Sequence, residues 1–366
     1  MNPIQHSNQP EPALEAVRGL ACAGFQSSPV GVGGRPSRRP CRPVTRTASM
    51  VLFLGLCLCL GQGVEPGRPF HFGFSSSLMD AVGENEARAA MKVWAESIVK
   101  SGAVRADPNV VYCRDLASLL AALQGGTVDG MALLTPEFFI LRDRVEFTRC
   151  IVASTEGKWT DEYLLLVRKD AGSSRIEDLA HKSLLLEKNP RLCMAIPWLD
   201  TMLVRTGLKP AREYFSRVAE ESKLTKTVLP VFFGQVDACI VTRKGYNAMV
   251  ALNPQVGTEL RVLAASPELV STGFFFRKGY PPDDLNRCML EFTRVHTTPS
   301  GQQILTVFLA DRLDEHPFSD LEATAALWME HNRLCGAPVA GAATGTTGDM
   351  SHNGPELKGP ASAPAP

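Results

Sequence analysis

The fold is decided by a stretch that the chain uses twice, first as Leu123-Gln124-Gly125-Gly126-Thr127-Val128-Asp129-Gly130-Met131-Ala132-Leu133-Leu134-Thr135 and again as Phe233-Gly234-Gln235-Val236-Asp237-Ala238-Cys239-Ile240-Val241-Thr242. In both copies a predicted helix ends at glycine, a Val-Asp turn follows, and a short apolar strand ends at threonine. A glycine just past a helix can adopt the left-handed conformation that ends it. An apolar run between turns indicates a strand buried on both faces. The two units therefore predict two similar α/β lobes that enclose a ligand at the carboxyl ends of their strands.

Length and charge narrow the class of protein. The 366 residues exceed one typical domain, and the net charge is zero. The first fifty residues carry six Arg against two Glu, so the remainder is mildly acidic. A nucleic-acid-binding domain is expected to show a basic stripe, and the composition argues against that function.

Residues 1–68 are predicted to be a leader and signal peptide rather than part of the fold. Four arginines within 38–46 precede the apolar run 50–60, and the small residues of Gly61-Gln62-Gly63 follow. This order is typical of a secretory signal around residues 38–63, which predicts a periplasmic or otherwise exported protein. A membrane anchor is the alternative, but the run is shorter than the roughly 20 residues that span a bilayer.

The cysteines do not predict a disulfide pattern or a metal site, and the C-terminal tail does not predict ordered structure. Six of the ten cysteines fall in the body of the chain: Cys113, Cys150, Cys193, Cys239, Cys288 and Cys335. They allow fifteen disulfide connectivities, and the spacing does not choose among these. No CxxC motif or Cys/His cluster with zinc spacing is found in the sequence, so neither a metal nor a cofactor is expected. Residues 336–366, rich in Gly, Ala, Pro, Thr and Ser, are predicted to be disordered.

The order of predicted elements defines the lobes. Strands at 70–74, 109–113, 129–134 and 147–154 alternate with helices, which indicates a parallel or mostly parallel sheet in a first lobe, residues 69–161. Residues 162–272 form a hinge strand and the second lobe. Residues 273–335 are predicted to form a return strand and helices that pack back on the first lobe. Two strands that run from apolar to basic, 163–169 and 272–279, are predicted to be hinge segments between the lobes.

At this point the chain resembles a periplasmic solute-binding protein of type II, and more narrowly the phosphate/phosphonate-binding (PhnD-like) family. The matching pieces, which together span roughly residues 69–335, are Phe72-Gly73-Phe74-Ser75-Ser76, Gly126-x-Val128-Asp129 with Leu134-Thr135-Pro136, Tyr163-Leu164-Leu165-Leu166-Val167, Ile176-Glu177-Asp178-Leu179, Gly234-x-Val236-Asp237-Ala238, and Ser266 through Lys278. The resemblance implies a two-lobed fold with two hinge-crossing strands. It also implies capture of a small, anionic solute of the phosphate or phosphonate type for an ABC importer permease or a membrane sensor.

The chain departs from this family at two places. The resemblance implies a Ser-Thr-Ser-Gly anion loop after the first strand of the second lobe, where Glu187-Lys188-Asn189-Pro190-Arg191 stands instead. A family histidine before the second Gly-x-x-Asp unit is replaced by the segment 222–227. These changes bear on the ligand rather than on the fold, because the site and the fold vary independently.

The candidate ligand-binding residues lie at predicted strand ends, turns and helix starts. They are Ser75, Ser76, Ser77, Thr135, Phe138, Tyr163, Asn189, Arg191, Lys223, Thr225 and Asp237. Hydroxyls and free N–H groups at helix starts suit an anion, and an arginine can hold a carboxylate or phosphate with two hydrogen bonds. Each also has a structural interpretation: the hydroxyls as helix caps, Phe138 as core, the charged side chains as solvated surface, and Asp237 as a turn former.

Three functions remain open at this stage. The first is an exported, monomeric solute-binding protein that does not bind nucleic acid and is not an enzyme. The second is a small-molecule lyase on the same bilobal scaffold, which would require a carboxylate or histidine of perturbed pKa in the cleft. The third is a ligand-free interaction module. No catalytic motif is found in a credible context, which favours the first.

Overall fold

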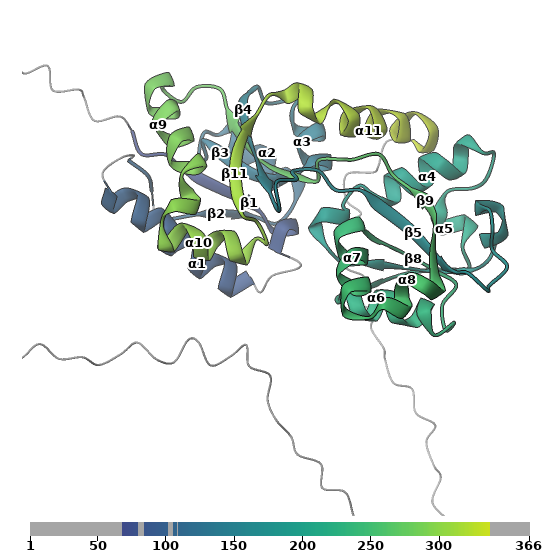
Figure 1. Cartoon of the computed structure of the whole chain (residues 1–366). Coiled ribbons are helices and arrows are strands. Elements are labelled where there is room, and N and C mark those ends of the chain that lie inside the picture. The colour runs from purple at the N-terminus through teal and green to yellow at the C-terminus, as the bar shows by residue number, and fades with distance from the viewer. Residues whose placement is uncertain (1–67, 80–83, 102–104, 108, 337–366) are drawn as a thin grey trace, which may run out of the picture. The chain divides into compact units, whose positions relative to one another are not determined.

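The computed structural model describes residues 68–79, 84–101, 105–107 and 109–336, which contain two β-sheets (Figure 1). The signal segment, residues 1–67 of the leader and residues 337–366 of the tail lie outside the described residues. The strands of the first sheet, in spatial order, are β11 (Arg312–His316), β4 (Phe147–Ser154), β10 (Thr272–Arg277), β3 (Gly130–Leu134), β1 (Phe72–Ser75) and β2 (Val111–Cys113). Those of the second sheet are β7 (Arg217–Glu221), β6 (Ser183–Glu187), β8 (Ala238–Thr242), β5 (Tyr163–Arg168) and β9 (Leu260–Ala265).

Both sheets are mixed rather than parallel throughout. In the first sheet β1 runs parallel to β2 and β3, whereas β10 is antiparallel to both β3 and β4, and β11 is antiparallel to β4. In the second sheet β6 is parallel to β7 and β8, and β5 is antiparallel to β8 and β9. The two-lobed α/β architecture is confirmed, with a parallel core of three strands in each lobe and antiparallel strands beside it.

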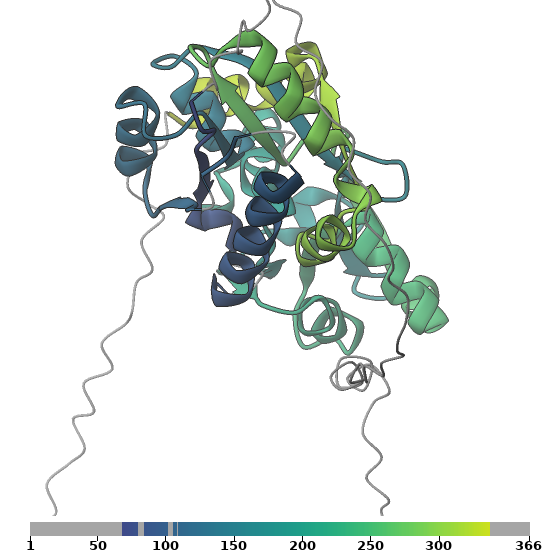
Figure 2. The same ribbon diagram turned by 90° about the vertical axis from the view of Figure 1, so that its left-hand side faces the viewer.

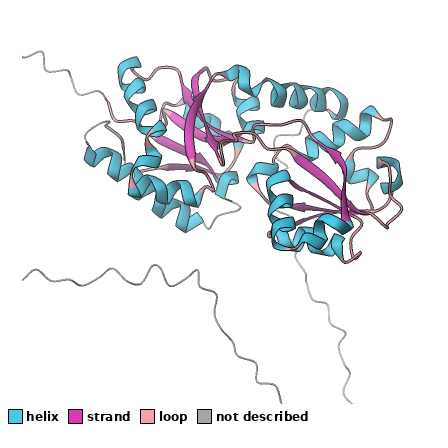
Figure 3. Cartoon of the chain, viewed as in Figure 1, coloured by secondary structure: helices cyan, strands magenta, loops and turns pink. Residues whose placement is uncertain are grey.

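Helices cover both faces of each sheet (Figure 3). The α-helices are α1 (Glu84–Ser101), α2 (Leu116–Gln124), α3 (Thr135–Leu141), α4 (Ala195–Arg205), α5 (Ala211–Tyr214), α6 (Leu224–Phe232), α7 (Arg243–Leu252), α8 (Pro254–Glu259), α9 (Pro282–Thr293), α10 (Pro299–Val307) and α11 (Glu322–Cys335). Short 3₁₀ turns are η2 (Ser76–Met79), η3 (Ile176–Leu179), η4 (Pro190–Leu192), η5 (Val295–Thr297) and η6 (Phe318–Leu321). Helices α1 and α10 lie side by side on one face of the first sheet, as Figure 1 and the turned view of Figure 2 both show.

The repeated unit of the sequence is one repeated structure. Helix α2 is followed by Gly126 at φ 70°, and helix α6 by Gly234 at φ 70°, before strands β3 and β8 begin. A left-handed residue at this position ends a helix, and glycine adopts it without the steric penalty of a side chain. Because both turns require glycine in this conformation, the two stretches have similar sequences.

The aspartates of the two units also have the same role. Asp129 Oδ2 accepts a hydrogen bond from the backbone N of His71 at 3.0 Å, and Asp237 Oδ2 accepts one from the backbone N of Ser183 at 2.8 Å. In each lobe the aspartate therefore binds the start of the strand that runs parallel to its own. Both aspartates lie at the amino ends of the strands.

The basic ends of β5 and β10 close each unit. Arg277 Nε donates to the carbonyl of Val128 at 2.7 Å, and Arg168 Nη1 donates to the carbonyl of Phe232 at 2.6 Å. Arg277 thus binds a carbonyl in the turn before β3, and Arg168 binds one at the end of α6. The basic residue at the end of each apolar strand therefore has a similar role in the two units.

The crossings between the lobes lie just before these two strands. Residues 155–162 lead from β4 into β5, and residues 266–271 lead from β9 into β10. The two crossings pair with each other, because Asp161 N donates to Leu269 O at 2.8 Å and Leu269 N donates to Asp161 O at 2.9 Å. Strand β5 itself belongs to the second sheet and β10 to the first.

The C-terminal helix contacts both lobes. We expect the last helices to pack on the first lobe, but α11 lies mainly against α4 of the second lobe and also contacts α3 of the first. Within the residues described, no helix has the length and apolarity required to cross a membrane.

Candidate functional site

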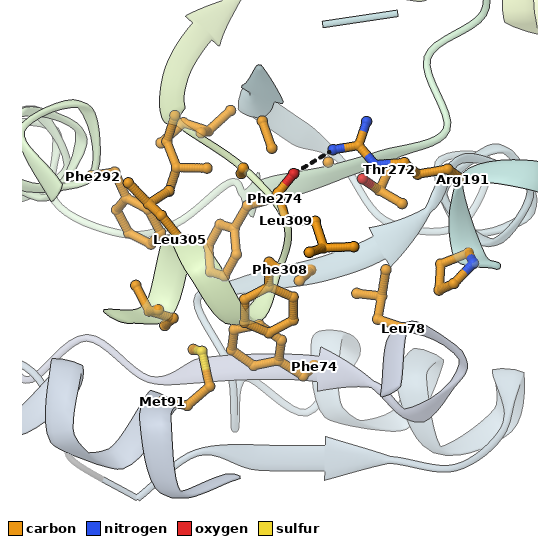
Figure 4. Close-up of a pocket in the computed structure, with 18 of the residues that line it drawn as sticks. Phe74, Leu78, Met91, Arg191, Thr272, Phe274, Phe292, Leu305, Phe308 and Leu309 are labelled. Carbon is orange, nitrogen blue, oxygen red and sulfur yellow. Dashed lines mark hydrogen bonds between the residues drawn. The ribbon is translucent and has the colours of Figure 1, made fainter. Parts of the chain in front are cut away.

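An apolar cavity of about 150 Å³ lies in the first lobe, on the sheet face covered by α1, α9 and α10 (Figure 4). Aromatic and aliphatic side chains from strands, helices and η2 make up most of its wall. They include Phe74, Leu78, Met91, Trp94, Ile151, Phe274, Phe292, Ile304, Leu305, Phe308 and Leu313. Packing of this kind follows from strands whose alternate residues point to one sheet face.

The second lobe contributes three residues to the same cavity, Asn189, Pro190 and Arg191. Asn189 caps η4, and Pro190 and Arg191 begin it, shortly after the carboxyl end of the parallel strand β6. The Asn189 side chain accepts the backbone N–H of Arg191 at 3.0 Å, and Pro190 has no N–H. The loop therefore offers side chains rather than backbone donors, and this separates it from a Ser-Thr-Ser-Gly anion loop.

Arg191 is the charged group among the described residues of the cavity wall. Its Nη2 donates to the carbonyl of Leu309 at 3.2 Å, the bond drawn in Figure 4, and to Thr155 Oγ1 at 3.1 Å. Its Nη1 lies 3.4 Å from Asp161 Oδ2. The guanidinium therefore contacts a crossing segment and the first lobe from an element of the second, beside a wall that is otherwise largely apolar.

A buried polar network surrounds this ion pair. Ser271 Oγ lies 2.8 Å from Asp161 Oδ2 and 2.8 Å from the carbonyl of Arg191, and the Tyr163 hydroxyl donates to the same carbonyl at 2.8 Å. Burial raises the pKa of the Asp161 carboxyl, and the Arg191 cation and the Ser271 hydroxyl oppose this shift. Burial also holds the pKa of Tyr163 well above its usual range. Tyr163 is thus a neutral donor that fixes the backbone of η4.

The polar residues after β1 and β3 are satisfied by each other. Ser75 Oγ donates to Glu137 Oε1 at 2.6 Å, and the backbone N of Ser77 donates to Ser75 Oγ at 3.3 Å. Ser76 Oγ donates to the carbonyl of Arg114 at 3.3 Å. Burial raises the pKa of Glu137, with the Ser75 bond opposing the shift. These three serines are not among the described residues that line the cavity.

Thr135 and Phe138 are placed in the core instead of the cavity wall. Thr135 is fully buried, and its Oγ1 donates to the carbonyl of Val270 at 2.8 Å. The Phe138 ring stacks on Phe275 with centroids 3.9 Å apart and an interplanar angle of 8°. Phe138 therefore packs in the core, because helix α3 turns this face toward the sheet, and it is not among the described residues that line the cavity.

The remaining candidates of the second lobe lie away from the cavity lining. Asp237 sits at the amino end of β8, where it binds Ser183 and lies 3.5 Å from Lys182 Nζ. Asp237 therefore lies at the opposite end of the strand from the carboxyl-end loops, a position that agrees with the turn-former interpretation. Lys223 precedes α6 and Thr225 lies in its first turn, and both are exposed.

The sequence reasoning missed the crossing residues and the apolar wall. Asp161 lies two residues before the first residue of the apolar strand β5, and Ser271 directly precedes β10. A carboxylate that is buried beside the start of a strand is a candidate for a perturbed pKa, and perturbed pKa values cluster at functional sites. The wall residues of α9 and α10 form no sequence motif, because only the three-dimensional fold brings them together around the cavity.

The comparisons with known proteins agree with this geometry. The profile of a family described as "ABC transporter, phosphonate, periplasmic substrate-binding protein" matches residues 82–317. The chain belongs to this family. It is therefore a solute-binding protein of the ABC transporter class, in a family that binds small solutes, works with transporter permeases and is periplasmic, which implies export. No curated protein sequence matches the chain.

Solved structures show the same fold at low sequence identity. XAC2383 from Xanthomonas citri, bound to chloride ion, is 14% identical with a TM-score of 0.54, and the match covers 73% of this chain and 98% of that one. A binding protein component of an ABC phosphonate transporter from Pseudomonas aeruginosa is also 14% identical, with a TM-score of 0.50 and coverage of 75% and 91%. Both likenesses support the two-lobed architecture.

Proposed function

We propose that this phosphonate-family binding protein captures a small organic anion that has a compact apolar body. The observation that carries the proposal is the guanidinium of Arg191 beside a cavity lined by apolar side chains. The anionic head would pair with Arg191 and the body would enter the cavity. A cavity of about 150 Å³ lined by Leu, Ile and Phe holds benzene when engineered into a protein, which sets the size of the body.

The buried carboxylate that pairs with Arg191 favours ligand binding at low pH. Asp161 competes with a ligand anion for Arg191, and burial raises the pKa of Asp161. As the pH falls through that raised pKa, Asp161 becomes neutral and Arg191 loses its internal partner. A ligand whose own charge does not change, such as benzenesulfonate, should therefore bind more tightly at lower pH.

Calorimetric titration with matched ligands tests the proposal. We expect phenylphosphonate to bind about thirtyfold more tightly than methylphosphonate, since burying an aromatic body contributes roughly 2 kcal/mol. Inorganic phosphate should bind weakly, and neutral benzyl alcohol should not show the pH dependence.

Variants locate the binding. Arg191→Met should weaken benzenesulfonate binding, and Ala153→Leu, which fills the cavity wall, should weaken phenylphosphonate more than methylphosphonate. Arg243→Met is the matched control, because Arg243 pairs with Glu162 and is not among the described residues of the wall. Equal affinities for all anions, or no effect of Arg191→Met, would contradict the proposal.

The proposal extends to the form of the working protein. We infer that the signal segment around residues 38–63 directs export, that the mature chain is monomeric, and that it binds its solute without chemical turnover. Amino-terminal sequencing and native mass spectrometry of protein exported from its host test the first two inferences. Unchanged phenylphosphonate after prolonged incubation tests the third.

A further inference from the structure

Two helices bring three metal-ligand side chains together outside the cavity. Asp200 comes from α4, and His331 and Cys335 come from α11, one helical turn apart. One potential ligand atom from each residue lies within 4.8 Å of the others. Residues at i and i+4 share one face of a helix, so the imidazole and the thiol face α4 together.

The carboxylate of this cluster is held in place by a second group. Asp200 Oδ1 accepts the backbone N–H of Ala211 at 2.7 Å, which leaves Oδ2 directed at His331 Nε2, 3.3 Å away. Metal-binding side chains are commonly fixed by such outer hydrogen bonds, because these bonds set the orientation of the ligand atom. The Ala211 bond therefore prepares Asp200 for a ligand role.

The histidine is buried with incomplete hydrogen bonding. His331 and Asp200 are each 8% exposed, and His331 Nδ1 has no hydrogen-bond partner among the described residues. The only polar contact of the His331 ring among the described residues is therefore the one between Nε2 and Asp200. The His331–Asp200 contact of 3.3 Å is also longer than a usual hydrogen bond, as it is when two atoms are spaced for a shared ion.

The chemistry of the three donors selects zinc. A tetrahedral Zn²⁺ with bonds of about 2.0–2.3 Å places its ligand atoms roughly 3.3–3.8 Å apart, and the Asp200–His331 contact already has this spacing. A carboxylate, a thiolate and a neutral imidazole together balance the charge of the ion. Sulfur and nitrogen donors disfavour Mg²⁺ and Ca²⁺, which prefer oxygen ligands.

We propose that Asp200, His331 and Cys335 form a Zn²⁺ site that joins the C-terminal helix α11 to α4 of the second lobe. Cys335 is partly exposed, so a water molecule can complete the fourth position. The sequence alone could not show this site, because Asp200 lies 131 residues before His331. The proposal is independent of the solute, since none of its residues lines the cavity.

Cobalt and zinc titrations of the reduced, metal-free full chain test the proposal. Co²⁺ should produce a thiolate charge-transfer band and the intense visible bands of a four-coordinate site, at one ion per chain, and Zn²⁺ should remove them. Zn²⁺ should also raise the melting temperature in a concentration-dependent way, because it binds the folded state.

Variants show whether these residues are the ligands. Cys335→Ser should abolish the charge-transfer band, and His331→Gln should weaken Zn²⁺ by more than the roughly 10–100-fold expected for an outer-shell change. His316→Gln is the matched control, because His316 and Asp320 form a similar pair at 2.8 Å that is not part of a three-residue metal-ligand group among the described residues. No stoichiometric Co²⁺ spectrum, or a spectrum that survives Cys335→Ser, would overturn the proposal.

Discussion

Replacing Arg191 by methionine should destabilise the fold in a way that depends on pH. The change leaves the Asp161 carboxylate, whose side chain is 10% exposed, without its cation. Breaking a fully buried ion pair costs about 3–5 kcal/mol. Here the Nη1–Oδ2 distance is 3.4 Å, the Arg191 side chain is 24% exposed, and Ser271 still donates to Asp161. We therefore expect a smaller loss of about 2 kcal/mol, or roughly 4–8 °C in melting temperature.

The sign of the pH dependence follows from the pKa of Asp161. Burial raises this pKa above its ordinary value of 3.8, and removing Arg191 raises it further. A carboxyl whose pKa is higher in the folded state stabilises that state when protonated, so its contribution is present below the unfolded pKa and is lost as the pH rises through the folded pKa. The destabilisation by Arg191→Met should thus be small near pH 4 and grow toward neutrality.

Thermal unfolding followed by circular dichroism between pH 4 and pH 8 measures this effect. The double variant Arg191→Met with Asp161→Asn should recover most of the lost stability at pH 7, because the unpaired charge is gone. Arg243→Met, which removes a more exposed pair with Glu162, should change stability by no more than about 1 kcal/mol. Equal destabilisation at pH 4 and pH 7, or a double variant no better than the single one, would refute this reasoning.

Three further predictions concern buried groups. Burial raises the pKa of Glu137 above its ordinary 4.5, so the stability it contributes should be lost as the pH rises through the folded pKa, and Glu137→Gln should remove that part of the melting profile between pH 4 and 8. Phe138→Ala should lower the free energy of unfolding by about 3–5 kcal/mol, measured by denaturant titration, while the folded variant keeps its affinity for benzenesulfonate; a selective loss of affinity would place Phe138 in the site after all. Burial raises the pKa of Cys288 to about 12, so iodoacetamide at pH 8 should alkylate the partly exposed Cys335 before Cys288. Peptide mass spectrometry measures the order of labelling, and earlier labelling of Cys288 would contradict its burial.

The duplicated unit made the architecture predictable, because its signals are local. The glycine after each helix and the apolar run after each aspartate are read within about a dozen residues, and both lobes follow from them. Strand β11 was not anticipated, since Arg312–His316 has a charged sequence and pairs only at the edge of the sheet beside β4. The contact of α11 with α4 was likewise hidden, because amphipathicity shows that a helix is covered and does not show by which partner.

The site was less predictable, since the position of a residue at a strand end does not fix the direction of its side chain. Asn189 and Arg191 were predicted as ligand contacts and line the cavity, which leaves their role in binding a proposal. Thr135 also follows a strand, yet its hydroxyl is used by a crossing carbonyl. Such pairings join residues more than a hundred positions apart, beyond the reach of a local pattern.

The paired crossings restrict how one sheet can turn relative to the other. The two reciprocal hydrogen bonds between Asp161 and Leu269 make a short antiparallel ladder of the only described segments that connect the sheets through the backbone. A rotation of one crossing segment is therefore transmitted to the other, so the two segments must rotate together unless these hydrogen bonds break. Arg191 contacts Asp161 in that ladder, so a solute bound to the Arg191 guanidinium, as proposed above, would act directly on the paired crossing segments.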